Sequence, residues 1–378
     1  MKRLTKTIIY GVVFSLIINI FLPVNFVKAS NKQVKMETDL NINARAYIAM
    51  DANSRVVLEE KNSETIMPMA STTKIITSLV ALKYGDLDKK VEISSRSASI
   101  HGSTVGYKKG ETISIKELLY GLMLRSGNDA AIAIAEGISG TVEEFVKLMN
   151  EYAASLGLID THFHSPHGLD DPEHYSTAYD LAIVTAETKK HPLFNQIVSS
   201  KDVEANKYNF TRSYHNINKI LWQIPSANGV KTGYTGGAGK CLVTSVNVKG
   251  NDVIIVVLNA PGRWKETSKI YDYVSKNYEY KKFYSKGEII DSAPQGRSDL
   301  RLTCDKDIII PIKNNGEYSV KTRVPKEINY NVKKGENLGT LYIFKQDKLI
   351  FNYALKADND YKVSITKKIK FLPRLLGK

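Results

Sequence analysis

Cysteine is scarce, with only Cys241 and Cys304 in 378 residues. The dense disulfide framework of a small secreted domain is therefore excluded, although these two thiols can still pair in an oxidising compartment. No cysteine and histidine cluster has the spacing of metal ligands. His162, His164 and His167 lie close together, but no carboxylate or cysteine stands at a ligand-like spacing. We interpret them as loop residues that pack a turn, and we expect no metal and no cofactor.

The chain also lacks a broadly basic body. Its formal net charge is +14, but residues 1–29 and residues 361–378 contain no acidic residue and together contribute +10 of this charge. The body between them is close to charge balance and carries no RNA- or DNA-binding motif, which excludes a nucleic-acid partner. We find no internal repeat and no low-complexity segment. The length and the 43% hydrophobic content indicate about two globular domains.

Both ends of the chain have the composition of targeting or attachment segments. A basic start, an apolar run over 8–27 and a small residue at Ala29 are typical of a secretory signal cleaved after that residue. An uncleaved membrane anchor is the alternative, because the apolar run is long. The basic tail, 361–378, mixes lysines with apolar residues around Pro373 and either binds anionic lipid peripherally or is solvated. With either a cleaved signal or an uncleaved anchor at the N-terminus, we expect the body of the chain to be exported.

Hydrophobic periodicity predicts a mixed α/β (α+β) domain followed by a small all-β domain. The predicted helices cover 68–82, 115–124, 130–136, 142–156, 177–189 and 268–278. Hairpins are predicted over 46–60 and 241–258, glycine-bearing loops over 102–110 and 161–176, and later strands over 307–312, 318–324, 341–344 and 348–355. An antiparallel sheet of about five strands with helices on its faces, in three layers, satisfies this pattern.

The first candidate for chemistry is the pair Ser71 and Lys74 at the start of an apolar helix. Residues three apart on a helix share a face, so hydroxyl and amine should lie side by side. A serine needs a neighbouring base, and a lysine serves as one only if burial, nearby cations or the helix dipole lower its pKa. The alternative is a helix cap beside a solvated lysine. The same spacing recurs at Ser364 and Lys367, where no site is expected.

Two further short motifs follow in order along the chain. Ser126-Gly127-Asn128 falls in a loop between two predicted helices, and Lys231-Thr232-Gly233 lies on or just before a predicted strand. Ser-x-Asn recurs elsewhere, whereas Lys-Thr-Gly occurs once. Taken singly, the serine and asparagine could cap the next helix and the lysine could be solvated. The order and the helix, loop and strand contexts match the triple of penicillin-binding proteins and class A β-lactamases.

With these motifs in place, the chain resembles the low-molecular-mass penicillin-binding proteins that are serine-type D-alanyl-D-alanine carboxypeptidases. The resemblance covers about residues 45–280 and rests on the blocks PMASTTKIITSLVAL, KKGETISIKELLYGLMLRSGNDAAIAIAE, HSPHGLDDPEHYSTAYDLAIVTAE and GVKTGYTGGAGKCLVTS. Residues 285–360 resemble the β-sandwich domain that follows in many members. The implied organisation is a signal peptide at 1–29, a catalytic domain at 30–283, a β-sandwich-like domain at 284–360 and a basic tail at 361–378.

The resemblance implies removal of the terminal D-alanine from peptidoglycan stem peptides through an acyl-enzyme, with β-lactam antibiotics as inhibitors. Ser71 would be the nucleophile and Lys74 its base, while Ser126 and Asn128 would relay a proton and hold the peptide. The substrate-binding residues would be Lys231, Thr232, Gly233, Tyr234 and, less specifically, Arg263. His167 is interpreted as loop architecture.

Three alternative functions are compared with the carboxypeptidase function. The same acyl-enzyme could serve a D,D-endopeptidase or transpeptidase that acts on cross-links. A non-catalytic wall-binding protein could keep the fold, but it need not keep Ser71, Lys74 and Lys231. A class A β-lactamase uses a Glu-x-x-Leu-Asn motif for deacylation, and we find none, so we expect slow turnover of penicillin.

Overall fold

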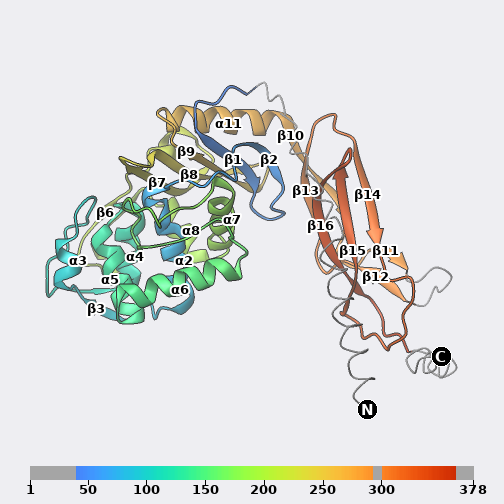
Figure 1. Ribbon diagram of the computed structural model, residues 1–378, viewed down its shortest axis with the longest axis horizontal. Helices are drawn as coiled ribbons and strands as arrows, with labels where there is room; N and C mark the ends of the chain where they lie inside the picture. Colours follow the sequence, from blue (N-terminus) through green and yellow to red (C-terminus); the bar gives the residue numbers. More distant parts are fainter. Residues whose placement is uncertain (1–39, 293–299, 363–378) are drawn as a thin grey trace, which may run out of the picture. The chain divides into compact units, whose positions relative to one another are not determined.

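The computed structural model describes residues 40–292 and 300–362 (Figure 1). The predicted signal segment at 1–29 and most of the basic tail lie outside these ranges. Among the described residues, no helix combines the length and apolar character needed to cross a bilayer.

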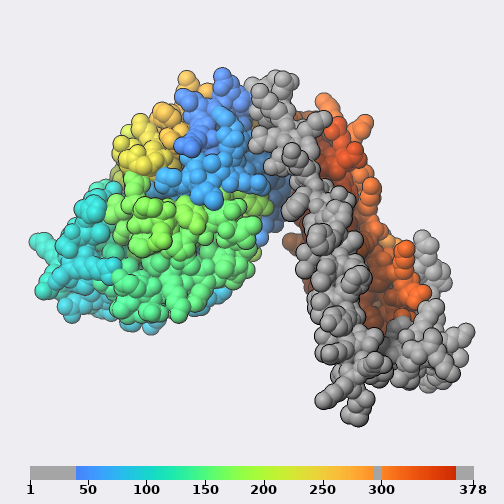
Figure 2. Space-filling view, in the orientation of Figure 1, coloured from blue at the N-terminus to red at the C-terminus, as the bar shows by residue number. Residues whose placement is uncertain are grey.

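A five-stranded antiparallel sheet forms the middle of the first domain, in the order β2-β1-β9-β8-β7. Its strands are β1 (Ala46–Asp51), β2 (Val57–Lys61), β7 (Ala227–Thr235), β8 (Gly239–Val248) and β9 (Asn251–Leu258). The first strand pairs with both β2 and β9, so the start of the domain is built into the same sheet as its end. Figure 2 shows the result on the surface, where blue N-terminal residues lie beside yellow and orange ones. The predicted hairpins and sheet are confirmed.

Successive residues of β9 are buried on opposite faces of this sheet. Ile254 and Val256 belong to a core shared with most helices, whereas Ile255 and Val257 belong to a second core that includes residues of α11 (Arg263–Asn277). A strand that is covered on both faces has a continuous run of apolar residues, and this explains the apolar run from Val253 to Leu258 in β9. Figure 1 shows α11 on one face and the helical layer on the other, as the predicted three-layer arrangement requires.

The five helices predicted before β7 are present, but four shorter helices were not predicted. The helical elements before β7 are η1 (Ala70–Thr73), α2 (Lys74–Tyr84), α3 (Ser95–Ser99), α4 (Ile115–Leu124), α5 (Asn128–Ser139), α6 (Val142–Ser155), α7 (Ala178–Thr188), α8 (Pro192–Ser199), α9 (Ala205–Tyr208) and α10 (Ile220–Gln223). Helix α10 contributes Ile220 to the second core, on the side of α11. Side chains of Ser114, Thr141 and Thr177 accept backbone N–H bonds and so start three of these helices. Short strand pairs, β3 (Lys90–Glu92) with β4 (Thr112–Ser114) and β5 (Asp202–Val203) with β6 (Tyr214–His215), join the connections.

Two predicted helix boundaries need correction at residues that matter for the site. Helix α5 starts at Asn128, so this asparagine is the first helical residue and not part of the preceding loop. Helix α11 starts at Arg263, five residues before the predicted start, so that this arginine follows β9 through a very short turn. Both shifts occur at helix ends, where sequence patterns are weakest.

After α11 the described chain is all β, as predicted. Its strands are β10 (Tyr278–Tyr284), β11 (Ile289–Ser292), β12 (Arg301–Thr303), β13 (Ile308–Lys313), β14 (Tyr318–Arg323), β15 (Asn337–Lys345) and β16 (Lys348–Ala357). Five of them form a sheet in the order β11-β12-β16-β15-β14, and β10 pairs with β13. Cys241 and Cys304 are both buried and free, so the disulfide left open by the sequence is not formed.

The two-sided burial of β9 gives a direct test of this architecture. Replacing fully buried Ile255 by alanine removes packed methylene groups and leaves a cavity, so we expect a loss of about 2–5 kcal/mol in the free energy of unfolding. Ile159→Ala is the control, because this isoleucine is 88% exposed, and its change should stay within about 0.5 kcal/mol. Urea unfolding would measure both. Equal losses in the two variants would contradict the three-layer core.

Candidate active site

Ser71 and Lys74 lie side by side at the junction of η1 and α2. The Lys74 Nζ is 2.9 Å from the Ser71 Oγ, because one helical turn separates the two residues. Lys74 is completely buried, whereas Ser71 remains partly accessible. The alternative of a solvated first-turn lysine is therefore wrong, and the predicted adjacency is confirmed.

The hydrogen bonds of Lys74 are compatible with both of its protonation states. Besides Ser71, its Nζ lies 2.7 Å from the Asn128 Oδ1 and 2.6 Å from the His167 carbonyl oxygen. An amide oxygen and a carbonyl oxygen can only accept, whereas a hydroxyl can donate or accept. An ammonium can donate to all three oxygens, whereas a neutral amine donates to two of them and accepts the Ser71 proton at its lone pair.

Electrostatics favour this neutral amine. Burial holds the pKa of Lys74 well below its usual range, and the nearby positive charge of Lys231 lowers it further. The Asp129 carboxylate works against both effects and raises this pKa. That carboxylate accepts backbone N–H bonds from Val105, Gly106, Tyr107 and Ala130, so it is held in place by the glycine-bearing loop.

The Ser126-Gly127-Asn128 segment begins with a strained backbone conformation at Ser126. Ser126 is buried and has φ of +60°, a left-handed conformation that few residues other than glycine adopt. Asn128 donates from Nδ2 to the His101 carbonyl at 2.8 Å, which fixes its Oδ1 toward Lys74. No side chain caps α5, so the alternative of a helix-capping serine or asparagine is not what the structure contains. Strained backbone held by its surroundings is common at functional sites.

Strand β7 passes directly beside the Ser71 turn at Gly233. A Cβ on this glycine would lie 3.0 Å from the Met69 carbonyl oxygen and 3.2 Å from the Ser71 backbone nitrogen. The absence of a side chain is therefore what lets the strand approach Ser71. Thr232 on one side of Gly233 is buried, whereas the Tyr234 side chain on the other side is 67% exposed.

Lys231 is a second buried cation on the same strand. Its Nζ donates to the carbonyl oxygen of Thr232 at 2.9 Å, and its side chain is 1% exposed. Burial first, and then the charge of Arg263, lower the pKa of Lys231 to about 7. The cation thus lies near its point of neutralisation at physiological pH. The alternative of a solvated strand lysine is wrong.

Arg263 lies behind β7 and binds backbone. Its Nη1 donates to the carbonyl oxygen of Gly233 at 2.6 Å and to that of Cys241 at 3.1 Å. These two residues are opposite each other in the β7–β8 ladder. Arg263 therefore fixes the part of β7 that faces Ser71, a role that the sequence did not reveal.

The loop 161–176 contributes in ways that motif reading missed. It gives the His167 carbonyl to Lys74, and its His174 lies under the Ser71 turn, where Nε2 is 2.8 Å from the Thr73 Oγ1. The Nδ1 of this histidine accepts the backbone N–H of His164 at 3.0 Å. The proton must therefore sit on Nε2 and be donated to Thr73, whose hydroxyl in turn donates to the Ala70 carbonyl.

The same loop is tied to the β7–β8 turn by Asp170. This carboxylate accepts the Thr235 hydroxyl at 2.5 Å and the Gly237 backbone N–H at 2.8 Å. Gly168, with φ of +88°, brings the loop so close to the Ser71 turn that a Cβ would lie 2.1 Å from the Ala70 carbonyl oxygen. The His167 carbonyl is thereby anchored from two directions. In the sequence, the one glycine and the two aspartates of HGLDD mark a loop but do not show its anchors.

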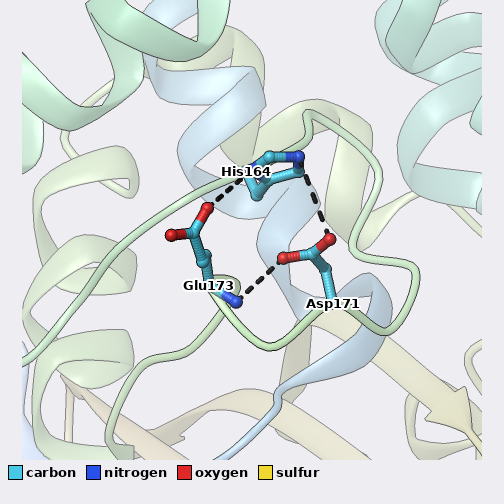
Figure 3. A group of neighbouring side chains, drawn as sticks. All are labelled: His164, Asp171 and Glu173. Atoms are coloured by element: carbon cyan, nitrogen blue, oxygen red, sulfur yellow. Dashed lines mark hydrogen bonds and ion pairs between the residues drawn. The ribbon is translucent and has the colours of Figure 1, made fainter.

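The interpretation of the clustered histidines needs one correction. His167 packs the turn as expected, because its Nδ1 lies 3.1 Å from the Ser165 Oγ within the loop. However, folding places Asp171 and Glu173 beside His164 on the loop surface (Figure 3). The premise that no carboxylate partner exists was therefore wrong, because a loop brings together residues that linear spacing keeps apart.

Two known protein families match parts of this chain. Residues 31–262 match the peptidase S11 family, described as D-alanyl-D-alanine carboxypeptidase. The chain belongs to this family. Residues 278–363 match the C-terminal domain of penicillin-binding protein 5.

Relatives and solved structures agree with that assignment over most of the chain. The carboxypeptidase DacF of Bacillus subtilis is 33% identical over 100% of this chain and 98% of its own length. The structure of penicillin-binding protein 5 from Haemophilus influenzae has a TM-score of 0.75 at 32% identity and covers 85% of this chain and 98% of its own. A mutant structure of the Streptomyces K15 DD-transpeptidase has a TM-score of 0.58 at 32% identity. It covers 62% of this chain and 98% of its own chain. The recognised family and the two-domain fold class are thus confirmed.

The buried loop histidine makes stability depend on pH. Burial lowers the pKa of His174 to about 4, below the usual value of about 6.5. Between these two pH values, this histidine binds a proton in the unfolded chain but not in the folded chain. This contribution to stability is complete above about pH 6.5 and is lost as the pH falls toward 4, by up to about 3 kcal/mol. His174→Gln, which keeps a donor for Thr73, should flatten that slope.

Urea unfolding between pH 4.5 and 7 would measure the slope in parent and variant. His101→Gln is the matched control, because this histidine is exposed and only its backbone carbonyl is used. An unchanged slope in His174→Gln would mean that another group carries the pH dependence.

Proposed function

We propose that this protein is a serine D-alanyl-D-alanine carboxypeptidase that removes the terminal D-alanine from peptidoglycan stem peptides. The observation that carries the proposal is the buried Lys74 amine, whose Nζ lies 2.9 Å from the Ser71 Oγ. In its neutral form the amine donates to its two other partners and directs its lone pair at the Ser71 proton. Family membership supplies the substrate class, since the relatives are named for this reaction. The same serine is expected to be acylated by β-lactams, as the name of the penicillin-binding relatives indicates.

In the acylation step, the Ser71 Oγ attacks the carbonyl carbon of the penultimate D-alanine while Lys74 takes its proton. The backbone N–H groups of Ser71 and Tyr234 are assigned to the developing oxyanion, because Gly233 brings the strand against the Ser71 turn. One such donor typically contributes about 3–4 kcal/mol to lowering the barrier. Formation of the oxygen–carbon bond gives a tetrahedral intermediate, which collapses to the acyl-enzyme as the carbon–nitrogen bond to the terminal D-alanine breaks.

The leaving amine needs a proton, and the substrate needs a fixed position. Ser126 is assigned to the proton relay and Asn128 to holding the peptide, because the latter already faces Lys74. An extended peptide can lie along the free edge of β7, the last strand in the sheet order. Water finally attacks the acyl-enzyme and releases the shortened peptide.

The substrate carboxylate is assigned to the Lys231 and Thr232 end of β7. Lys231 supplies the charge and Thr232 a hydroxyl donor. Arg263 adds positive charge at this end, but its Nη1 already binds two backbone carbonyls. We therefore assign it chiefly to holding β7, with the predicted carboxylate contact left to its other N–H groups.

Transfer to an amine is the second candidate reaction. The similarity to the K15 DD-transpeptidase favours it, since that protein matches the catalytic part of this chain. An acyl-enzyme that meets an amine in place of water completes a transpeptidation. An acyl-enzyme formed from a cross-linked peptide and then attacked by water completes an endopeptidation. Adding a glycine-type acceptor to the assay separates the reactions by product mass.

The proposed location is outside the cytoplasmic membrane, where peptidoglycan lies. The predicted signal at 1–29 supports export, and the basic tail at 361–378 supports peripheral contact with anionic lipid. Deleting 361–378 should release the mature protein from membranes at low salt. An unchanged distribution would remove the tail from the proposal.

Ser71→Ala tests the nucleophile directly. We expect no penicillin adduct by intact-mass spectrometry, and D-alanine release from a peptide ending in D-Ala-D-Ala should fall by about 10⁴-fold or more. Ser364→Ala is the matched control, because it removes the serine of the second Ser-x-x-Lys sequence and should change neither result. An adduct that persists in Ser71→Ala would exclude the proposed acyl-enzyme.

The pKa of Lys231, about 7, predicts a pH dependence of substrate capture. As the pH rises through 7 the Lys231 ammonium loses its charge. The kcat/KM for the D-Ala-D-Ala peptide should therefore decline above about pH 7. Lys231→Arg retains a charge throughout this range and should abolish the decline, whatever its absolute rate. If the arginine variant keeps the same limb, the titrating group is not Lys231.

A further inference from the structure

The outer surface of the loop 161–176 carries a group of side chains that the proposed reaction does not use. The His164 Nε2 lies 3.8 Å from the Asp171 Oδ2, and its Nδ1 lies 3.6 Å from the Glu173 Oε2. One potential ligand atom from each residue falls within 4.8 Å of the other two. Figure 3 shows the imidazole between the two carboxylates.

A shared metal ion would bind one ring nitrogen of His164 and one oxygen of each carboxylate. Zinc binds imidazole nitrogen and carboxylate oxygen at about 2.0–2.2 Å, so two ligands of a tetrahedral ion lie about 3.4 Å apart. One such atom from each residue lies within 4.8 Å of the other two, so these exposed side chains would draw closer around the ion. The carboxylates face different ring nitrogens, and the His164 side chain, which is 54% exposed, can turn to present one of them. Water would complete the coordination.

The charges of the group also favour a cation. Within residues 40–292 and 300–362, neither Asp171 nor Glu173 forms an ion pair with a lysine or arginine, and His164 is their shared partner. The Asp171 Oδ1 accepts the Glu173 backbone N–H at 2.8 Å, which leaves its Oδ2 for an ion. Two neighbouring carboxylates repel each other unless a cation lies between them.

The backbone that carries these ligands is already held in place. His162 and Tyr175 exchange two backbone hydrogen bonds of 2.9 and 3.0 Å, which close the loop at its base. Next to the ligands, the buried His174 accepts the N–H of His164. An ion would therefore bind without the entropic cost of ordering the loop.

We propose that His164, Asp171 and Glu173 form a binding site for a divalent transition-metal ion of the zinc class. The imidazole distinguishes it from a calcium or magnesium site, since those ions prefer oxygen ligands alone. The site is independent of the proposed reaction. It lies on the loop that gives the His167 carbonyl to Lys74 and His174 to Thr73, so an ion there stabilises the support of the catalytic turn.

Calorimetric titration of zinc chloride into the untagged, chelator-treated full-length chain tests this site. We expect one site of micromolar affinity and a rise of several degrees in Tm at a hundredfold excess over Kd. His164→Gln and Glu173→Gln should each weaken binding tenfold or more. Without metal their Tm should equal that of the parent, because both side chains are exposed.

A matched control is available on the same domain. His215 and Asp202 form an exposed pair at 2.6 Å, and within the described residues no third potential metal ligand lies beside this histidine and carboxylate. His215→Gln should bind zinc as the parent does, and Co²⁺ should give a visible absorption band that is retained in His215→Gln and lost in His164→Gln. No zinc binding at micromolar concentration, parent affinity in His164→Gln, an equal loss in His215→Gln, or binding of Ca²⁺ in preference to Zn²⁺ would each overturn the proposal.

Discussion

The burial of the Lys74 amine is the constraint on which the rest of the site depends. A charged ammonium removed from water costs several kcal/mol unless its surroundings compensate, and a neutral amine costs much less. Here the side chain is completely buried, and a second cation, Lys231, lowers its pKa further. The amine can therefore act as a base for Ser71, and the fold supplies two fixed acceptors so that its lone pair has one remaining direction.

Each partner of that amine comes from a different part of the domain. Ser71 belongs to η1, Asn128 begins α5 and His167 belongs to the loop 161–176, so no local segment could assemble the site alone. Anchors outside the motifs hold the pieces: Asp129 in backbone amides, Asp170 on the β7–β8 turn and Arg263 on the paired strands. A loss of activity can thus arise from a residue that never touches the substrate.

Residue identity and periodicity were enough to predict the sheet, most helices and the Ser71–Lys74 pair, because these depend on local spacing. The His167 carbonyl could not be predicted, since every residue has a carbonyl and only the loop conformation selects one. The same limit hid the carboxylates beside His164 and the backbone contacts of Arg263. The left-handed φ of Ser126 was also invisible, because no glycine marks it.

Cys241 gives the catalytic strand an unexpected chemical neighbour. Its carbonyl shares the Arg263 Nη1 with Gly233, while burial raises the pKa of its thiol to about 11. Thiolates react with oxidants and electrophiles, and a protonated, enclosed sulfur does so very slowly. The sulfur directly behind the substrate strand is therefore redox-silent. The pairing of β7 with β8 therefore places no reactive thiolate beside the strand that faces Ser71.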